Sequence, residues 1–312
     1  MSVDSRAVTR IGRLELTPAL FARIALWSAV ALYVIIISGA TVRLTGSGLG
    51  CEGWPGCGQG RLFPEKDHHQ AVEFGNRVVA IFPLTLSVLT WLAAWRLREA
   101  SAWVRWLAFA VAAMTIFQAP LGLITIRLDL DPVAVLSHFL LAIVALGGAV
   151  VVAIEARILD RGREPPLVHR WVALGGTALA AVGLVLVVTG TLVTAAGPHA
   201  GDPDVVDRLW HLTDAMWVHV RASAAFGLGF LALLIYLWRQ RPTSEPLLRV
   251  AGALLALLLV QMAVGELQYR NELPWWLVLV HVSLAAAVWA VMVLLATRES
   301  RADVVGEPLS SG

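Results

Sequence analysis

The 312-residue chain contains little charge and almost no cysteine. Only 15% of its residues are Asp, Glu, Lys or Arg, whereas 58% are hydrophobic, and the mean hydropathy is +0.74. So low a charged fraction excludes an ordinary soluble globular domain. The formal net charge of +2 gives no reason to expect nucleic acid as a partner. The composition therefore predicts a polytopic membrane protein with lipid as its surroundings.

Eight hydrophobic runs are long enough to cross the roughly 30 Å hydrocarbon core of a bilayer, which takes about 20 helical residues. They lie near residues 22–42, 70–95, 103–126, 133–156, 169–193, 212–238, 247–268 and 275–297. Backbone groups in lipid must bond within their own segment, so helices are expected. Residues 1–20 are polar and lack a cleavable signal pattern, so we expect the first helix to be retained. The sequence predicts an all-α integral membrane protein with eight transmembrane helices.

Matching residues recur at one spacing along the chain. His138 and His281 are 143 residues apart (281 − 138), and so are Asn76 and His219 (219 − 76). Helix ends, mid-helix residues and loop residues that share one offset indicate an internal tandem repeat. We expect two four-helix bundles, in residues 1–160 and 161–312. The offset also relates Trp95-Arg96-x-Arg98 to Trp238-Arg239-x-Arg241, and Gln118-x-x-x-Gly122-x-x-x-x-Arg127 to Gln261-x-x-x-Gly265-x-x-x-x-Arg270.

The arginines are distributed unevenly between the two sides of the predicted membrane. Sixteen of the 24 basic residues precede the first run, follow the last, or lie between runs 2 and 3, 4 and 5, or 6 and 7. Because cytoplasmic loops carry an excess of Lys and Arg, both termini are expected in the cytoplasm. The sixteen are Arg6, Arg10, Arg13, Arg23, Arg96, Arg98, Arg105, Arg157, Arg161, Arg163, Arg170, Arg239, Arg241, Arg249, Arg298 and Arg301.

The only two cysteines, Cys51 and Cys57, follow the first hydrophobic run, in a connection that the arginine bias places outside the cytoplasm. An oxidising compartment favours a disulfide between them. Two free thiols or a metal pair are the alternatives, although five intervening residues do not match zinc or thioredoxin motifs. The same connection contains Gly48-x-Gly50-x-x-Gly53. It is not interpreted as a dinucleotide-binding motif, because it follows a membrane helix rather than a strand.

Three histidines lie well inside the predicted spans rather than at a span end. Ionisable side chains inside a membrane span are costly and usually face a bundle interior or a cavity. His138 and His281 are related by the repeat, and His219 is expected at the same depth as His281. Two neutral imidazoles at one depth suit bis-histidine ligation of haem iron, a low-spin arrangement that supports electron transfer. A satisfied core histidine, a pore or a proton relay is the alternative. Four further histidines, His68, His169, His199 and His211, are expected to be capping or surface residues.

The first half breaks this symmetry. Asn76, a poor iron ligand, stands where the second half has His219, and Glu73 and His69 precede it by three and seven residues. Residues 69, 73 and 76 share one helical face. A carboxylate beside a macrocycle is suited to proton transfer or to stabilising positive charge. The asymmetry suggests a storage site and a working site, and an ion pair of Glu73 with Arg77 is the alternative.

Two arginines lie inside the predicted spans beside the candidate ligands. They are Arg77 and Arg221. Guanidinium groups bind carboxylates in bidentate fashion, and haem carries two propionates. We therefore predict that Arg77 and Arg221 bind propionates, with snorkelling to lipid headgroups as the alternative.

Three strings of sequence are specific enough to suggest a family. Residues 38–51 read SGATVRLTGSGLGC and are followed by Trp54, Pro55 and Cys57, and residues 69–77 read HQAVEFGNR. Residues 189–191 read TGT, and residues 197–202 read GPHAGD. These strings resemble the first extracytoplasmic loop, the catalytic helix 2 motif and the loop after helix 5 of the haem A synthase family. Many members have histidine where this chain has Asn76, and the Glu-Phe-Gly-Asn-Arg form resembles an actinobacterial variant.

The resemblance implies a definite chemistry. Such enzymes oxidise the C8 methyl group of haem O to the formyl group of haem A, for terminal oxidases of the cytochrome aa3 type. It implies haem b on His219 and His281, and haem O in the first half with His138 as a ligand and Glu73 as the essential carboxylate. It also implies a Cys51–Cys57 disulfide. Because of Asn76, the second ligand of the substrate haem is either His69 or absent.

On this basis we expect successive oxidations at C8 that pass through an alcohol to the aldehyde, with electrons from an unidentified donor. Haem O synthase is an expected partner, the plasma membrane is the expected location, and a homo-oligomer is compatible with the sequence. A di-haem cytochrome b carrier and a duplicated transporter are the rival interpretations. A carrier should have a histidine pair in each half. A transporter should have matched helix breaks, whereas Pro120 is matched by Ala263.

Overall fold

The fold, taken from a computed structural model, is described for residues 16–58, 60–65, 67–162, 167–168, 170–240, 244–300 and 303–304. Within these ranges the chain is mainly helical, as the sequence predicts. The eight helices are α1 Pro18–Leu44, α2 His68–Arg96, α3 Ala102–Arg127, α4 Pro132–Arg161, α5 Arg170–Ala196, α6 Leu212–Arg239, α7 Glu245–Arg270 and α8 Trp275–Ser300. Two short strands, β1 Leu167–Val168 and β2 Asp303–Val304, pair in parallel. Several residues used to predict the orientation, including Arg6 and Arg241, lie outside the described residues, as does His169.

All eight helices are long and apolar enough to cross a membrane, with mean hydropathies from 1.8 to 2.5 over their most apolar windows. They extend a few residues beyond most of the predicted runs, because polar residues cap them. Asp131 accepts hydrogen bonds from the backbone N–H groups of Val133 and Ala134, and Asp67 accepts one from Gln70. Gly162 ends α4 in the left-handed region, with φ 56°. The chain is a multi-pass membrane protein.

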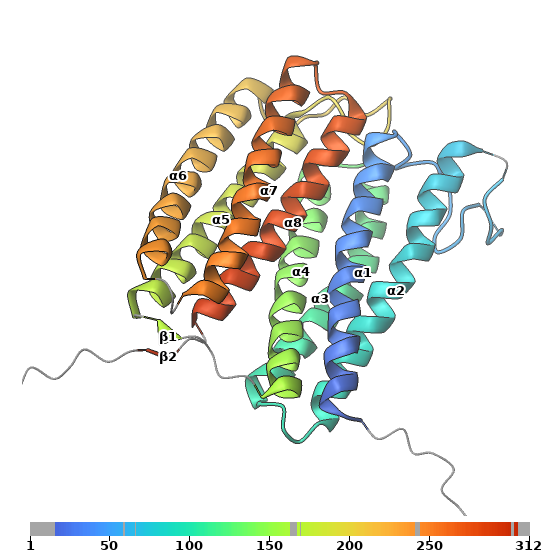
Figure 1. Ribbon diagram of the computed structural model, residues 1–312. Helices are drawn as coiled ribbons and strands as arrows, with labels where there is room; N and C mark the ends of the chain where they lie inside the picture. The colour runs from blue at the N-terminus through green and yellow to red at the C-terminus, as the bar shows by residue number, and fades with distance from the viewer. Residues whose placement is uncertain are drawn as a thin grey trace, which may run out of the picture.

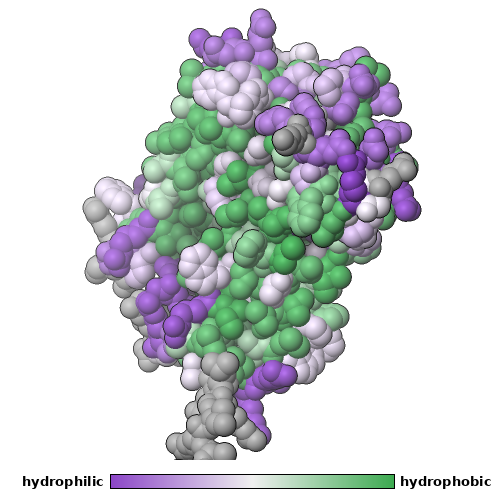
Figure 2. All heavy atoms as spheres, turned by 90° about the vertical axis from the view of Figure 1, so that its right-hand side faces the viewer, coloured by the Kyte–Doolittle hydropathy of each residue, from purple (hydrophilic) through white to green (hydrophobic). Residues whose placement is uncertain are grey.

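The outer surface of the helices has the character expected of a lipid-facing surface. Leu228 and Met262 are 70% and 68% exposed, and both lie in the middle of their helices. Figure 2 shows hydrophobic side chains across the middle of one face, with hydrophilic side chains gathered at its two ends. So many exposed large apolar side chains would be a liability in water and are ordinary in a bilayer.

The helices form two groups of four that lie side by side (Figure 1). In the first group, α1 and α3 each pack on α2 and α4, so α2 and α4 occupy opposite corners. In the second group, α5 and α7 each pack on α6 and α8, which are likewise at opposite corners. The groups meet where α4 and α1 contact α8 and where α4 contacts α5. We call the end that carries the connections 45–67, 128–131, 197–211 and 271–274 the disulfide end.

Two hydrogen bonds between α8 and the first group join the two groups. The indole Nε1 of Trp289 donates to the carbonyl of Ile143 on α4 (2.9 Å), and the hydroxyl of Tyr33 on α1 donates to the carbonyl of Ser283 (3.2 Å). Gly147 permits this approach, since a Cβ there would lie 2.9 Å from Trp289 Nε1. One hydrophobic core, which includes residues from α1, α4, α5, α6, α7 and α8, runs through both groups.

The 143-residue offset recurs in the backbone of two connections. Asp129 and Leu130 have φ of 48° and 59°, and Glu272 and Leu273, which stand at the matching positions, have φ of 60° and 59°. The backbone N–H of Leu130 donates to the carbonyl five residues before it (2.9 Å), and that of Leu273 does the same (2.8 Å). Two identical left-handed connections of non-glycine residues are unusual in a chain of unrelated halves, and they support the predicted tandem repeat.

Candidate functional site

His219 is held in one orientation by a helix that it faces. Its ring nitrogen Nδ1 lies 3.1 Å from the hydroxyl oxygen of Thr189 on α5. That hydroxyl donates its single proton to the carbonyl of Leu186 (2.9 Å), so it accepts a proton from His219 Nδ1. The other ring nitrogen, Nε2, therefore carries a lone pair. This tautomer is the one that binds a metal, and such second contacts orient metal-binding histidines.

His281 presents the same tautomer from the opposite corner of the second group. The side-chain amide nitrogen of Gln261 lies 3.0 Å from His281 Nε2. Because an amide NH₂ only donates, Nε2 is the acceptor and carries a lone pair. In the first group, Gln118 stands at the matching position and donates instead to the backbone carbonyl of His138 (3.3 Å). His138 and His281 therefore each have a glutamine neighbour at the matching position, but Gln261 contacts the ring of its histidine and Gln118 contacts the backbone.

The surroundings of these histidines fit a bound macrocycle. Among the described residues, the buried side-chain atoms without a hydrogen-bond partner include Nδ1 of both His138 and His281 and Oε1 of both Gln118 and Gln261. Buried polar atoms of this kind call for a partner. Glycine faces each ring of the second group: a Cβ at Gly190 would lie 3.1 Å from His219 Cε1, and one at Gly265 would lie 3.2 Å from His281 Cε1. His219 and His281 thus stay the predicted iron ligands of the second group, and His138 stays the predicted ligand of the first. Gln261 would have to turn away from Nε2 for His281 to bind iron.

A bare metal ion is a poorer match for this arrangement. Within the part of the chain that the structure describes, no three His, Cys, Asp or Glu side chains gather as a metal-binding cluster. Haem iron needs only one or two protein ligands, because the porphyrin supplies the rest.

Glu73, the predicted catalytic carboxylate, is 4% exposed and is held by charge and by hydrogen bonds. Its Oε2 accepts a hydrogen bond from the backbone N–H of Cys51 (2.7 Å), and its Oε1 forms a salt bridge with Arg77 Nη2. The ion pair with Arg77, which the sequence left as an alternative, is therefore present. A buried carboxylate needs such partners to stay ionised.

Arg77 also reaches the connection that the two cysteines close. Cys51 and Cys57 form the predicted disulfide, with a Cα–Cα distance of 4.4 Å. The guanidinium Nη1 of Arg77 donates to the carbonyls of Gly53 (2.7 Å), Pro55 (3.2 Å) and Gly56 (2.6 Å), all inside the disulfide ring. Both terminal nitrogens of Arg77 thus contact protein groups, and its predicted contact with a propionate stays a prediction.

Asn76 and His69 lie on α2 at different levels. Seven residues separate them, which is a rise of about 10 Å along a helix. Asn76 Oδ1 is buried and has no hydrogen-bond partner among the described residues. His69 Nδ1 lies 2.9 Å from the hydroxyl of Ser47, at the disulfide end. This geometry favours an open position at the level of Asn76 over ligation by His69, and the assignment stays a prediction.

Arg221 points away from the ligand that it follows. Two residues along a helix correspond to a turn of about 200°, so Arg221 and His219 leave α6 on nearly opposite sides. Its guanidinium lies 5.6 Å from the ring centroid of the exposed Trp217, and both line a shallow pocket of about 410 Å³ that includes Asp214. The predicted contact of Arg221 with a haem propionate has no support from this geometry.

The sequence did not single out the contacts that join the two groups at the disulfide end. Arg43 on α1 donates from Nε to the carbonyl of His199 (2.8 Å) and from Nη2 to that of Thr194 (2.8 Å). His199 Nε2 lies 2.8 Å from the carbonyl of Leu273. The expectation that His199 is a capping or surface residue is therefore wrong, because it links two connections of the second group. No helical periodicity could have indicated contacts between residues so far apart in the chain.

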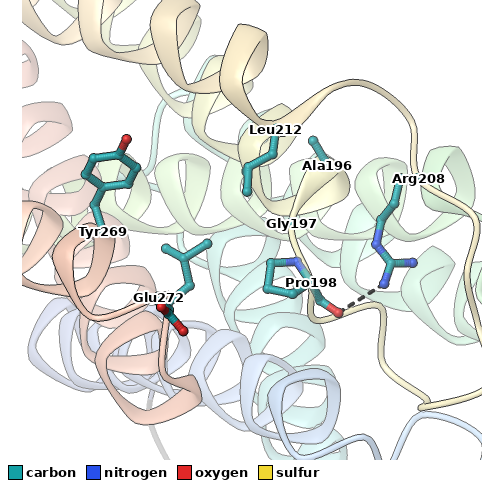
Figure 3. A pocket seen from close by; sticks show the side chains of 8 residues that line it. Ala196, Gly197, Pro198, Arg208, Leu212, Tyr269 and Glu272 are labelled. Atoms are coloured by element: carbon teal, nitrogen blue, oxygen red, sulfur yellow. Dashed lines mark hydrogen bonds between the residues drawn. The ribbon is translucent and has the colours of Figure 1, made fainter.

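A pocket of about 510 Å³ opens at the disulfide end of the second group (Figure 3). It contains none of the predicted iron ligands. Arg208 lies on its wall and donates from Nη2 to the carbonyl of Pro198 (3.0 Å), the bond drawn in Figure 3. Its lining residues are Ala196, Gly197, Pro198, Arg208, Leu212, Tyr269, Glu272 and Leu273.

Known proteins similar to this chain share nearly its whole length. Residues 22–293 match the family model COX15-CtaA, described as cytochrome oxidase assembly protein. A protein of Symbiobacterium thermophilum named heme A synthase is 26% identical over 285 residues, 86% of this chain and 92% of the relative. Proteins of the same name from Shouchella clausii and Geobacillus kaustophilus are 28% and 26% identical, over 88% and 91% of this chain and 97% and 94% of the relatives. These matches confirm the family resemblance seen in the sequence strings, and the chain belongs to the cytochrome oxidase assembly protein family.

Proposed function

We propose that this chain is a haem A synthase, which oxidises the C8 methyl group of haem O to the formyl group of haem A. One observation carries the proposal. The two halves have histidines at matched positions, yet among the residues that the structure describes only the first half has a buried carboxylate. This is Glu73, and Met216 stands at its position in the second half. Two sites that only relay electrons would not require a carboxylate in one half alone, whereas a reaction at a substrate uses such a group to move protons.

The second half would hold haem b as the resident cofactor, and His219 and His281 are the residues that would bind its iron. A haem with two imidazole ligands supplies one-electron transfer when bound. Thr189 fixes the ring tautomer of His219 and leaves its Nε2 lone pair open. At His281 the Nε2 lone pair accepts from the Gln261 amide, so Gln261 would turn aside when His281 binds the iron. The glycines at 190 and 265 leave space beside the rings.

The first half would receive haem O as the substrate. His138 would bind the iron on one side, and Asn76 would leave the other side open. Glu73 would stabilise positive charge or move protons as C8 is oxidised through an alcohol to the aldehyde. Its carboxylate stays in place during these steps because Cys51 N–H and Arg77 hold one oxygen each.

The remaining assignments are also part of the proposal. The halves 1–160 and 161–312 would be related by duplication, as the matched left-handed connections suggest. The plasma membrane is the expected location, with both termini in the cytoplasm, because the arginine-rich connections lie at the end opposite the disulfide. Haem O synthase would supply the substrate, a separate oxidant would take up the electrons removed from C8, and a redox partner would exchange electrons with the haem of the second half.

Pigment analysis tests the proposal. The chain is coexpressed with a haem O producer, and the haems are extracted and separated. Loss of haem O with formation of the formyl haem is expected. In Glu73→Ala, we expect haem O or a hydroxylated intermediate to accumulate. Unchanged haem b with reversible redox activity and no formyl haem would instead indicate a di-haem electron carrier.

A further inference from the structure

One guanidinium group connects the buried carboxylate of α2 to the disulfide ring. The ring runs from Cys51 to Cys57, and Arg77 donates to three of its carbonyl oxygens while it also pairs with Glu73. The backbone N–H of Cys51, which belongs to the ring, donates a hydrogen bond to the other carboxylate oxygen of Glu73. Arg77, Glu73 and the ring therefore form a closed set of charge-assisted hydrogen bonds.

The ring lies directly against the first turn of α2. Both sulfur atoms of the disulfide lie close to the carbonyl of Gln70, at 3.7 Å and 3.8 Å. A Cβ at Gly50 would lie 2.7 Å from the carbonyl oxygen of His69, so only glycine permits this approach. The ring is thus placed by packing, and Arg77 then fixes the position of Glu73 relative to it.

We propose that Arg77 is the positioning residue of Glu73, and that its function is to lock the carboxylate against the disulfide ring rather than to bind a haem propionate. The proposal rests on the proposed role of Glu73 in haem O oxidation. The planar, forked guanidinium of arginine suits this position, because its several N–H groups can reach the carboxylate and the ring carbonyls at the same time. A carboxylate that reacts at one carbon atom of a large planar substrate has to be held to within a fraction of an ångström.

Two comparisons within the molecule support a specific role. In the second half, the positions that match Glu73 and Arg77 are Met216 and Val220, and residues 197–211 contain no cysteine. The whole set is therefore confined to the half assigned to the substrate. Glu266 and Arg270 form an ion pair with the same spacing at the same end of α7, but the Arg270 side chain is 73% exposed, against 15% for Arg77. An exposed pair of that kind has little effect on stability.

The test uses the full-length protein in membranes that contain its natural electron donor, with haem O added at graded concentrations. Arg77→Gln removes the charge, Arg77→Lys keeps the charge without the fork, and Arg270→Gln is the matched control. We expect kcat in Arg77→Gln to fall about 10- to 100-fold, the range that small misplacements of a catalytic group produce. KM should stay within about threefold, because the interaction acts on the reacting state and not on substrate binding. Arg77→Lys should recover only part of kcat, and Arg270→Gln should match the unmodified protein.

A second readout does not depend on turnover. The infrared carboxylate bands that disappear in Glu73→Gln belong to Glu73, and they should shift in Arg77→Gln but not in Arg270→Gln. The absorption of the haem in the second half reports whether the variants fold. A rise in KM with unchanged kcat would overturn the proposal in favour of a propionate contact, and unaltered kcat and infrared bands would also overturn it. If the unmodified protein makes no formyl haem, the proposed function fails, while the infrared shift still tests the positioning of Glu73.

Discussion

Thr189 on α5 accepts a hydrogen bond from Nδ1 of His219 on α6 over 3.1 Å, and passes its own proton to the carbonyl of Leu186. The direction of both bonds follows from the single proton of the hydroxyl. Because Nδ1 carries the proton that Thr189 accepts, the lone pair of the His219 ring lies on Nε2, the nitrogen that an iron would bind.

Thr189→Val should weaken haem binding in the second half. The substitution keeps the volume and removes the acceptor, and loss of such a second contact lowers metal affinity by about 10- to 100-fold. Haem content per protein after purification, and titration of haem into the haem-free protein, measure the effect. Thr191→Val is the control, because Thr191 is equally buried and its hydroxyl bonds only the carbonyl of Val188. Equal haem affinity in the two variants would contradict the assignment.

Gly190→Ala should disturb the same site sterically. The new Cβ would lie 3.1 Å from His219 Cε1, so the ring must tilt or shift by a few tenths of an ångström. We expect a changed low-spin absorption spectrum and reduced haem content, measured on the purified protein. Gly252→Ala on α7 should leave both unchanged, since the structure places no described atom within 4 Å of its Cβ. An unaltered spectrum in Gly190→Ala would show that His219 does not face the iron.

Substitution of the two repeat-related histidines should separate the two sites. His281→Ala should remove the low-spin haem spectrum of the second half, because one of the two imidazoles proposed to bind the iron is lost. His138→Ala should retain that spectrum and lose binding of added haem O, measured by the difference spectrum. The two variants are matched, since both side chains are half-buried beside a glycine at equivalent positions. Loss of the low-spin spectrum in His138→Ala alone would reverse the assignment of the halves.

Asn76→His should place an imidazole where the second half has His219. If the iron of bound haem O lies between α2 and α4 with an open side at position 76, the variant should convert its spectrum to a six-coordinate low-spin form. Electron paramagnetic resonance of the oxidised protein loaded with haem O measures the change. His69→Ala should not alter the spectrum, because His69 lies about 10 Å further along the helix. A low-spin substrate haem that becomes high-spin in His69→Ala would show instead that His69 is the second ligand.

The sequence by itself determined the membrane class, the eight spans, the disulfide and the family. Bilayer thickness sets the number of apolar residues in each span, so the spans can be read from composition and length. The Cys51–Cys57 bond followed from there being only two cysteines, six positions apart, on the side expected to be oxidising. The specific strings of residues 38–51 and 69–77 indicated the family because they combine loop and helix residues in a fixed order.

Only the tertiary structure decided which groups those residues contact. Helical periodicity predicted that Glu73 and Arg77 share a face, and it could not predict that three carbonyls of the disulfide ring meet Arg77 there. Nor could it place Thr189 beside His219, or Arg221 against Trp217 and away from the ligand. The physical reason is that the angular position of a side chain is a property of its own helix, whereas its partner depends on how helices and connections distant in the chain pack against one another.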